Sequence, residues 1–269
     1  MRIFTRVLPL ALAATLFVLA SACSSGGGGG DTVSADPLEI LSASAESFQE
    51  DVQSVESDLQ LSINAGGLDI STSSQMTYQA PDQMHMTMAI TGVGEFEILA
   101  LGSEIYLNVP SMGWISFSLD DVGLEEVGLD AVALQKTFSD HSVLDYAALI
   151  QGIGGGVEDL GDETIDGATY RHYRGSVDFA ALVAAFSDAS GASGDLGLDD
   201  ASGALTFDVW VDPDSYLPYK LTASGEFPFG IDSMVFDATM LFTSYNEPVD
   251  IPGAPADAIP LAGLLAGLN

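Results

Sequence analysis

The side chains best suited to catalysis are few and scattered. His85, His141 and His172 are the only histidines, and their spacing matches no HExxH or other metal-ligand motif. His85 falls on the polar side of an alternating segment, which favours an edge or solvent-facing histidine over a general base. The chain has neither a GxSxG nucleophile elbow nor a phosphate-binding glycine loop before a helix. We therefore predict no catalytic residue, no metal site and no cofactor, and we expect that the protein is not an enzyme.

Two charged clusters allow a binding interpretation as well as a structural one. Arg171, His172 and Arg174 form a basic group that could grip a phosphate or carboxylate headgroup. Pairing with some of the 39 Asp and Glu residues is the favoured interpretation. The segment Asp212-Pro213-Asp214-Ser215 shares acidic spacing with a calcium loop but lacks its glycine and closing glutamate, so it predicts a hairpin turn.

The N-terminus is typical of an export signal. Two arginines precede an apolar stretch, Leu8 to Ala20, that is short for a membrane span, and small residues lead directly to Cys23. This is the lipobox pattern of bacterial lipoproteins, in which the cysteine thiol receives a lipid. Cys23 is the only cysteine, so it has no disulfide partner within the chain. The sequence predicts a signal peptide over 1–22, a lipidated Cys23 and a glycine-rich tether over 23–35.

The composition excludes some partners. The formal net charge is −33, and such a surface repels nucleic acid and anionic lipid headgroups alike. Hydrophobic residues make up 47% of the chain, enough for a folded core despite this charge. We expect one domain over 36–250, followed by a tail over 251–269 that is rich in Pro and Leu and either packs on a sheet edge or is loose.

Hydrophobic periodicity predicts the elements of this domain. Asp36 is a plausible N-cap with Pro37 at the first helical position, and Leu38, Leu41, Ala45, Phe48 and Val52 form one apolar stripe. From Val55 the period changes to two, and short glycine-rich turns join the alternating segments. Further helices are expected within 130–152 and after Asp178, and a glycine- and aspartate-rich loop over 187–202. The predicted fold class is α+β: a single strongly curved antiparallel sheet, an unclosed β-barrel of about nine to eleven strands, with two or three helices on its concave side.

Three segments resemble lipoproteins of the LppX/LprG type, which are related in fold to the LolA/LolB lipoprotein carriers. The first runs from Tyr78-Gln79-Ala80-Pro81-Asp82 through to Gly113-Trp114, the second from Glu163 to Asp178, and the third from Trp210-Val211-Asp212-Pro213 to Val249. They occur in the family's order and cover most of the domain. The resemblance implies an unclosed β-barrel with helices over its hollow, and a role in holding or moving lipidic molecules in the envelope.

The apolar sides of the strands are the predicted ligand-binding surface. Methionines such as Met84, Met86 and Met88 conform to varied apolar ligands, although ordinary core packing explains them nearly as well. The predicted lining consists of seventeen residues: Leu59, Leu61, Met76, Met84, Met86, Met88, Phe96, Ile98, Ile105, Leu107, Trp114, Leu149, Phe186, Phe207, Val209, Leu221 and Phe236.

The sequence therefore favours a lipoprotein that is lipid-anchored through Cys23 on the extracytoplasmic side of the cell membrane. Its expected cargo is a lipid acyl chain or a lipoprotein, bound and transferred within the envelope. The alternative is a scaffold or sensor with a filled core that binds a protein partner in the envelope. No nucleic-acid partner is expected.

Overall fold

The computed structural model describes residues 36–65, 67–119, 150, 156–178, 203–229 and 232–266. Residues 35–269 form one compact unit, and the fold below is that of this unit. The predicted signal peptide, Cys23, the tether and the loop over 187–202 lie outside the described residues. So do the helices expected within 130–152 and after Asp178, apart from Ile150, which has helical backbone.

Helix α1 (Pro37–Asp51) begins as its sequence predicts. The Asp36 side chain accepts a hydrogen bond from the backbone N–H of Leu38 at 3.0 Å, and Pro37 occupies the first turn. Leu41, Ala45 and Phe48 are buried, as the predicted stripe requires. Leu38, predicted as the first residue of that stripe, is 38% exposed and does not belong to the buried part.

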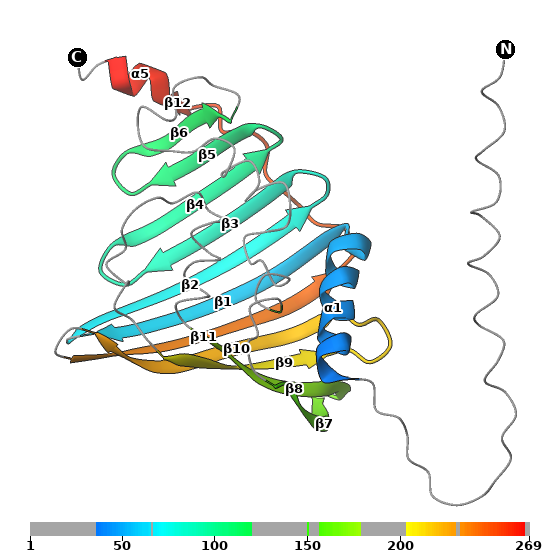
Figure 1. The fold of residues 1–269 in the computed structure, drawn as a ribbon. Coiled ribbons are helices and arrows are strands. Elements are labelled where there is room, and N and C mark those ends of the chain that lie inside the picture. Colours follow the sequence, from blue (N-terminus) through cyan, green and yellow to red (C-terminus); the bar gives the residue numbers. More distant parts are fainter. Residues whose placement is uncertain are drawn as a thin grey trace, which may run out of the picture. The chain divides into compact units, whose positions relative to one another are not determined.

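Eleven longer strands and one two-residue strand form a single sheet (Figure 1). The first half consists of β1 (Ser54–Ala65), β2 (Leu68–Gln79), β3 (Gln83–Ile90), β4 (Gly94–Leu101), β5 (Glu104–Val109) and β6 (Gly113–Ser118). The second half consists of β7 (Glu158–Ile165), β8 (Ala168–Asp178), β9 (Ala204–Val211), β10 (Pro218–Phe229) and β11 (Asp232–Tyr245). The two-residue strand is β12 (Ile259–Pro260). The spatial order is β12-β6-β5-β4-β3-β2-β1-β11-β10-β9-β8-β7, and every neighbouring pair among the eleven longer strands is antiparallel.

The sheet is curved and does not close, because its end strands β7 and β12 are not paired with each other. Strands β2, β10 and β11 are long, with 12, 12 and 14 residues. Four of the eight residues of β2 from Leu68 to Gln75 are Ser or Thr, so apolar alternation is weak there although β-branched threonine suits a strand.

The C-terminal tail joins the sheet edge. Strand β12 (Ile259–Pro260) pairs in parallel with Ile115 and Ser116 of β6, and α5 (Leu261–Ala266) follows it. Neither described helix has the length and hydropathy of a membrane span.

The core lies between α1 and one face of the sheet. Phe48 of α1 makes edge contacts with the rings of Phe242 and Tyr245 on β11, at 5.5 and 6.2 Å between ring centroids. Leu41, Ala45 and Val52 belong to the same buried cluster as side chains from most of the longer strands. One side of α1 thus seals one part of the sheet.

Candidate functional site: the apolar face of the sheet

The strand registers place most of the predicted lining on one continuous face, which we call the apolar face. Neighbouring residues follow one another across the sheet, for example Leu59 opposite Met240 and Met86 opposite Ile98. Fourteen of the seventeen predicted residues share this face: Leu59, Leu61, Met76, Met84, Met86, Met88, Phe96, Ile98, Ile105, Leu107, Phe207, Val209, Leu221 and Phe236. On β1–β6 the apolar face carries no charged residue.

The remaining three predicted residues do not join it. Trp114 is opposite Asn108 of β5 and therefore lies on the other face, out of phase with Ile115 and Phe117. Leu149 and Phe186 lie outside the described residues.

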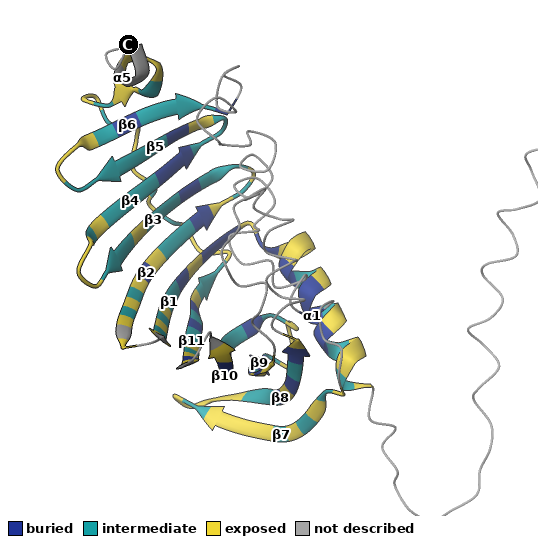
Figure 2. Ribbon diagram, turned by 60° about the vertical axis from the view of Figure 1, so that its left-hand side comes forward, coloured by how far each residue is buried: buried dark blue, intermediate teal, exposed yellow. Residues whose placement is uncertain are grey.

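The apolar face of β1–β5 is sealed at one end of each strand and partly open at the other. At the end near α1, the side chains are at most 3% exposed: Val55, Tyr78, Met84, Ala100 and Ile105. Toward the opposite end the apolar residues are only partly buried: Ile63, Ile70, Ile90, Phe96 and Val109. Figure 2 shows this change from dark blue to teal along the strands. Because the apolar side chains at this end are partly exposed, an apolar ligand can pack against them.

The apolar face of β8–β11 is packed instead. Phe207 is fully buried, and a Cβ atom added at Gly175 of β8 would lie 2.4 Å from its Cζ atom. Phe227 is also fully buried, and a Cβ added at Gly203 or Gly225 would lie 2.8 Å from its ring. Glycines here leave the space that the two rings fill. Phe207 and Val209, predicted as lining, therefore belong to a filled part of the core.

Sequence reasoning missed several members of the apolar face because it selected only part of each alternating run. Tyr78, Ala100 and Met240 are in phase with the chosen residues and are buried. Ser57 and Ser74 are buried on the same face, and the Ser57 hydroxyl has no hydrogen-bond partner among the described residues. No apolar periodicity could reveal these two serines.

Two described hollows lie over the opposite face, which we call the polar face. Their volumes are about 820 and 800 Å³. Both are lined by Gln60, Ser73, Glu95 and Thr239 together with other polar residues of the same face. Apolar residues also contribute, among them Leu61 and Val93 in the first hollow and Leu59, Met88 and Phe96 in the second. The polar face of β1–β4 that borders these hollows carries the charged residues Asp58, Glu95 and Glu97, whereas the apolar face of β1–β6 carries none, so we assign the candidate ligand surface to the apolar face.

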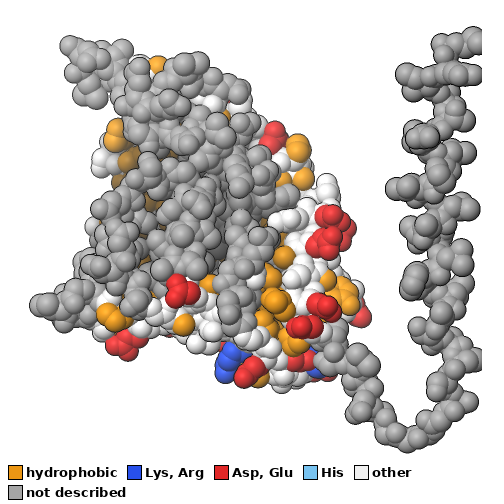
Figure 3. All heavy atoms as spheres, viewed as in Figure 1, with side chains coloured by type: hydrophobic (Ala, Val, Ile, Leu, Met, Phe, Trp, Pro, Cys, Tyr) orange, Lys and Arg blue, Asp and Glu red, His pale blue; other side chains and the backbone are white. Residues whose placement is uncertain are grey.

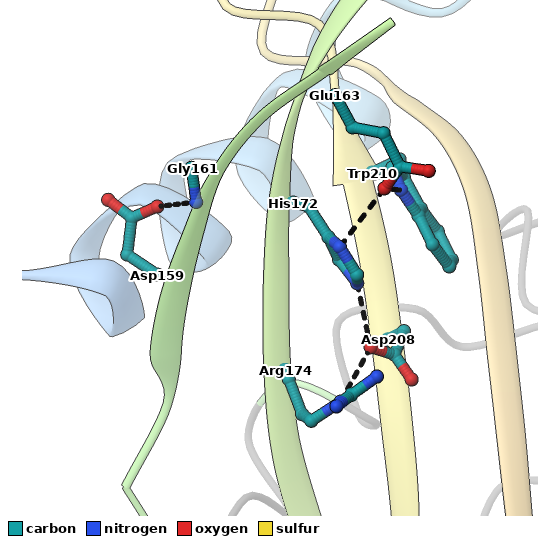
Figure 4. Close-up of polar contacts among 7 residues, drawn as sticks. All are labelled: Asp159, Gly161, Glu163, His172, Arg174, Asp208 and Trp210. Atoms are coloured by element: carbon teal, nitrogen blue, oxygen red, sulfur yellow. Dashed lines mark hydrogen bonds and ion pairs between the residues drawn. The ribbon is translucent and has the colours of Figure 1, made fainter. Parts of the chain in front are cut away.

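The predicted basic cluster lies on β8 and is paired with carboxylates (Figure 4). His172 Nε2 is 2.7 Å from Asp208 Oδ1, and Arg174 Nε donates to the same oxygen at 2.8 Å. Arg171 donates to Asp162 at 2.9 Å and to Asp159. In Figure 3 the blue groups lie beside red ones at the lower end of the molecule. Pairing with carboxylates is therefore confirmed for this cluster.

Ring contacts connect the basic cluster on β8 with side chains of β9 and β10. The His172 ring stacks on Trp210 of β9 with 4.2 Å between centroids, and Lys220 Nζ of β10 lies 4.8 Å from the Trp210 ring. The Trp210 indole N–H donates to Glu163 of β7 at 2.7 Å. Side chains from four adjacent strands thus hold this end of the sheet together.

The acidic segment after β9 is a turn, as predicted. Asp212 Oδ1 accepts hydrogen bonds from the backbone N–H groups of Asp214 and Ser215 at 2.8 and 2.9 Å. No group of three potential metal ligands occurs within the described ranges.

Tyr170 and Tyr219 form a stacked pair near this turn, with 4.2 Å between ring centroids. Burial, followed by the charges of Asp212 and Asp166, raises the pKa of Tyr170 above its ordinary value. Burial, followed by Asp166, raises the pKa of Tyr219, whose hydroxyl donates to Asp166 at 3.3 Å. Both phenols therefore keep their protons at a pH where free tyrosine loses its proton.

This difference predicts a loss of stability at alkaline pH. In the unfolded chain Tyr170 and Tyr219 ionise near pH 10, whereas in the folded chain these two tyrosines ionise at higher pH. As the pH rises through about 10, the unfolded state releases protons first, and the free energy of unfolding falls. Urea unfolding from neutral to alkaline pH should show this decline, and the variant Tyr170→Phe/Tyr219→Phe should show a shallower one. Equal slopes for the two proteins would contradict the prediction.

Comparison with known proteins finds resemblances among solved structures only. No family model and no curated protein sequence matches the chain. Among solved structures it resembles the lipoprotein LppX of Mycobacterium tuberculosis, with a TM-score of 0.48 and 18% identity over 81% of this chain and 100% of LppX. It also resembles LprF of Mycobacterium bovis, with a TM-score of 0.47 and 16% identity over 80% of this chain and 95% of LprF. A LolA superfamily protein of Nitrosomonas europaea matches with a TM-score of 0.30 and 13% identity, over 81% of this chain and 96% of that chain. The resemblance to LppX/LprG-type and LolA-type proteins that the sequence segments indicated thus recurs among solved structures.

Proposed function

We propose that this chain is a lipoprotein of the cell envelope, anchored through Cys23, whose apolar face binds the acyl chains of a lipid and passes them on. The observation that carries the proposal is the burial gradient on β1–β5. Val55 and Met84 are sealed beneath the core near α1, while Ile90 and Phe96 at the other end keep part of their apolar surface exposed.

The driving force would be burial rather than specific polar recognition. An acyl chain gains roughly 0.8 kcal/mol for each CH₂ group removed from water, so a chain of about sixteen carbons needs no designated headgroup contact. Met76, Met86 and Met88 lie side by side around Ser74 at the centre of this face and are partly buried. Their flexible thioethers can adapt to chains of different shape.

A binding role without catalysis fits the charged groups. The described basic side chains of β8 are engaged by carboxylates, and His85 on β3 is 2.8 Å from Glu97 on β4. We also propose that the helices lie on the concave side of the sheet, so that their movement would admit and release the cargo.

The test is native mass spectrometry of the chain expressed without residues 1–22 and with Cys23→Ser, which removes the anchor. We expect a fraction of the protein to carry a co-purified mass of lipid size, and we expect the delipidated chain to bind a fluorescent long-chain fatty acid. A protein with no co-purified lipid and no fatty-acid binding would end the proposal and favour a scaffold with a filled core.

A further inference from the structure

The turns at the two ends of the strands differ in charge. One end of the strands holds the turns that join β1 to β2, β3 to β4 and β5 to β6, and we call these three turns the glycine rim. The β10–β11 hairpin, in which β11 begins at Asp232, lies at the same end of the sheet beyond β1 and is not part of the glycine rim. Residues 65–68, 90–94 and 109–113 there include no charged residue in a chain of net charge −33. The opposite end, the acidic rim, carries the turns with Asp82, Asp166, Asp212 and Asp214.

The glycine rim also carries the two most exposed large apolar side chains of the described residues. Val93 is 61% exposed and Met112 is 57% exposed. Each stands in a hairpin turn closed by a backbone hydrogen bond, from Val93 N–H to Ile90 at 3.1 Å and from Met112 N–H to Val109 at 3.0 Å. The tight turns hold both side chains at the tips rather than folded back onto the sheet.

These two tips are neighbours. Gly94 has φ +132°, and a Cβ placed on it would lie 3.0 Å from Pro110 Cγ in the next turn. The turn of β3 and β4 therefore touches the turn of β5 and β6, and Val93 and Met112 belong to one uncharged edge. Asp69 and Glu95 lie on the polar face of their strands, and Val93 lines a hollow over that face together with Glu95 and Asp237.

The exposed edge is continuous with the open end of the apolar face. Ile90 precedes the first turn and Val109 precedes the second, and both are partly buried residues of that face. A lipid chain that left a bilayer at Val93 and Met112 would meet apolar side chains without crossing a charged group.

We propose that the glycine rim docks on the surface of a phospholipid bilayer, with Val93 and Met112 entering the interface, so that acyl chains pass between the bilayer and the apolar face. This inference rests on the proposed function. An acidic protein is repelled by anionic headgroups, so contact is least unfavourable through the part that carries no charge. Exposed apolar side chains at such a contact gain free energy by burial in the interface.

The test measures flotation of the chain without residues 1–22 and with Cys23→Ser on phosphatidylcholine vesicles. The variant Val93→Asp/Met112→Asp should bind the vesicles about tenfold more weakly or worse, because two apolar contacts are replaced by charges. The control Leu160→Asp/Tyr216→Asp adds the same charge at exposed apolar residues, 44% and 39% exposed, away from this rim, and its binding should be unchanged.

Vesicles with added phosphatidylglycerol give a second signature. Binding to them should rise with salt, because screening weakens repulsion between like charges while the apolar contact persists. Failure of the parent chain to bind either vesicle, or equal loss in both double variants, would overturn the docking proposal. So would a concentration-dependent dimer that Val93→Asp/Met112→Asp abolishes without any vesicle binding.

Fatty-acid binding in vesicle-free solution separates the two proposals. The variant Val93→Asp/Met112→Asp should bind the fluorescent fatty acid like the parent chain, since neither residue belongs to the apolar face. Lost vesicle binding with retained fatty-acid binding supports the rim as the docking edge. If the parent chain binds the fatty acid but does not bind vesicles, the docking proposal is refuted and the proposed function is not.

Discussion

Replacing Phe207 with alanine should lower the free energy of unfolding by about 3 to 5 kcal/mol, as expected for a large side chain removed from a packed core. The Phe207 ring is fully buried and occupies the space that Gly175 leaves on the neighbouring strand. Because backbone surrounds this space, the site cannot collapse around the cavity. Urea unfolding followed by circular dichroism would measure the loss.

Phe96→Ala is the matched control, since it removes the same atoms from the same face of the sheet. Phe96 lies in the partly open half, where it is only partly buried opposite Met88. We expect roughly 1 to 2 kcal/mol of destabilisation, in proportion to the smaller area removed from water. Fatty-acid affinity should respond in the opposite order, falling for Phe96→Ala and staying near that of the parent chain for Phe207→Ala. Equal destabilisation by the two variants would show that the face is packed uniformly and has no open half.

The sequence predicted which residues share a face because strand alternation is a local property. Leu59 to Ile63 and Met84 to Ile90 alternate with polar residues, and their register partners alternate in the same phase. The misplacement of Trp114 was avoidable. Ile115 and Phe117 carry the phase of the apolar face, and Trp114 precedes them by an odd step.

The burial gradient could not be predicted from the sequence. Met84 and Ile90 are equally apolar members of one alternating run, yet Met84 is 1% exposed and Ile90 is only partly buried. Met84 belongs to the buried cluster that includes residues of α1 and of the second half of the sheet, whereas Ile90 does not. That packing depends on contacts between residues far apart in the chain. The fit of Phe207 against Gly175 likewise depends on the register of β8 and β9.

The sequence shows which turns carry charged residues and which do not, but it does not show which turns lie at the same end of the sheet. Val93 and Met112 are separated by nineteen positions, and each alone is an ordinary apolar turn residue. Only the strand order places their turns side by side at one end of the sheet. The antiparallel strand order thus brings uncharged turns that are far apart in the sequence together at one edge of the sheet.

A single carboxylate on the apolar face should abolish most ligand binding. Met88 lies in the partly open half, between Ser74 on β2 and Phe96 on β4. Met88→Asp would place a charge where an acyl chain must lie, and no cation on this face of β1–β6 could pair with it. Binding would then require a carboxylate to lose its water, which is strongly unfavourable. We expect affinity for the fluorescent fatty acid to fall by at least about tenfold, which corresponds to 1.4 kcal/mol.

Thr87→Asp separates the effect of position from that of charge. Thr87 is the preceding residue of β3, exposed on the polar face, so the variant adds the same charge and the same poor strand former a few ångströms away. Its fatty-acid affinity should match that of the parent chain. If both variants lost affinity equally, repulsion between an acidic protein and an anionic probe would explain the result. If only Met88→Asp lost it, the chain must lie on the apolar side of β3, because the two residues differ in little except the face of the sheet to which they belong.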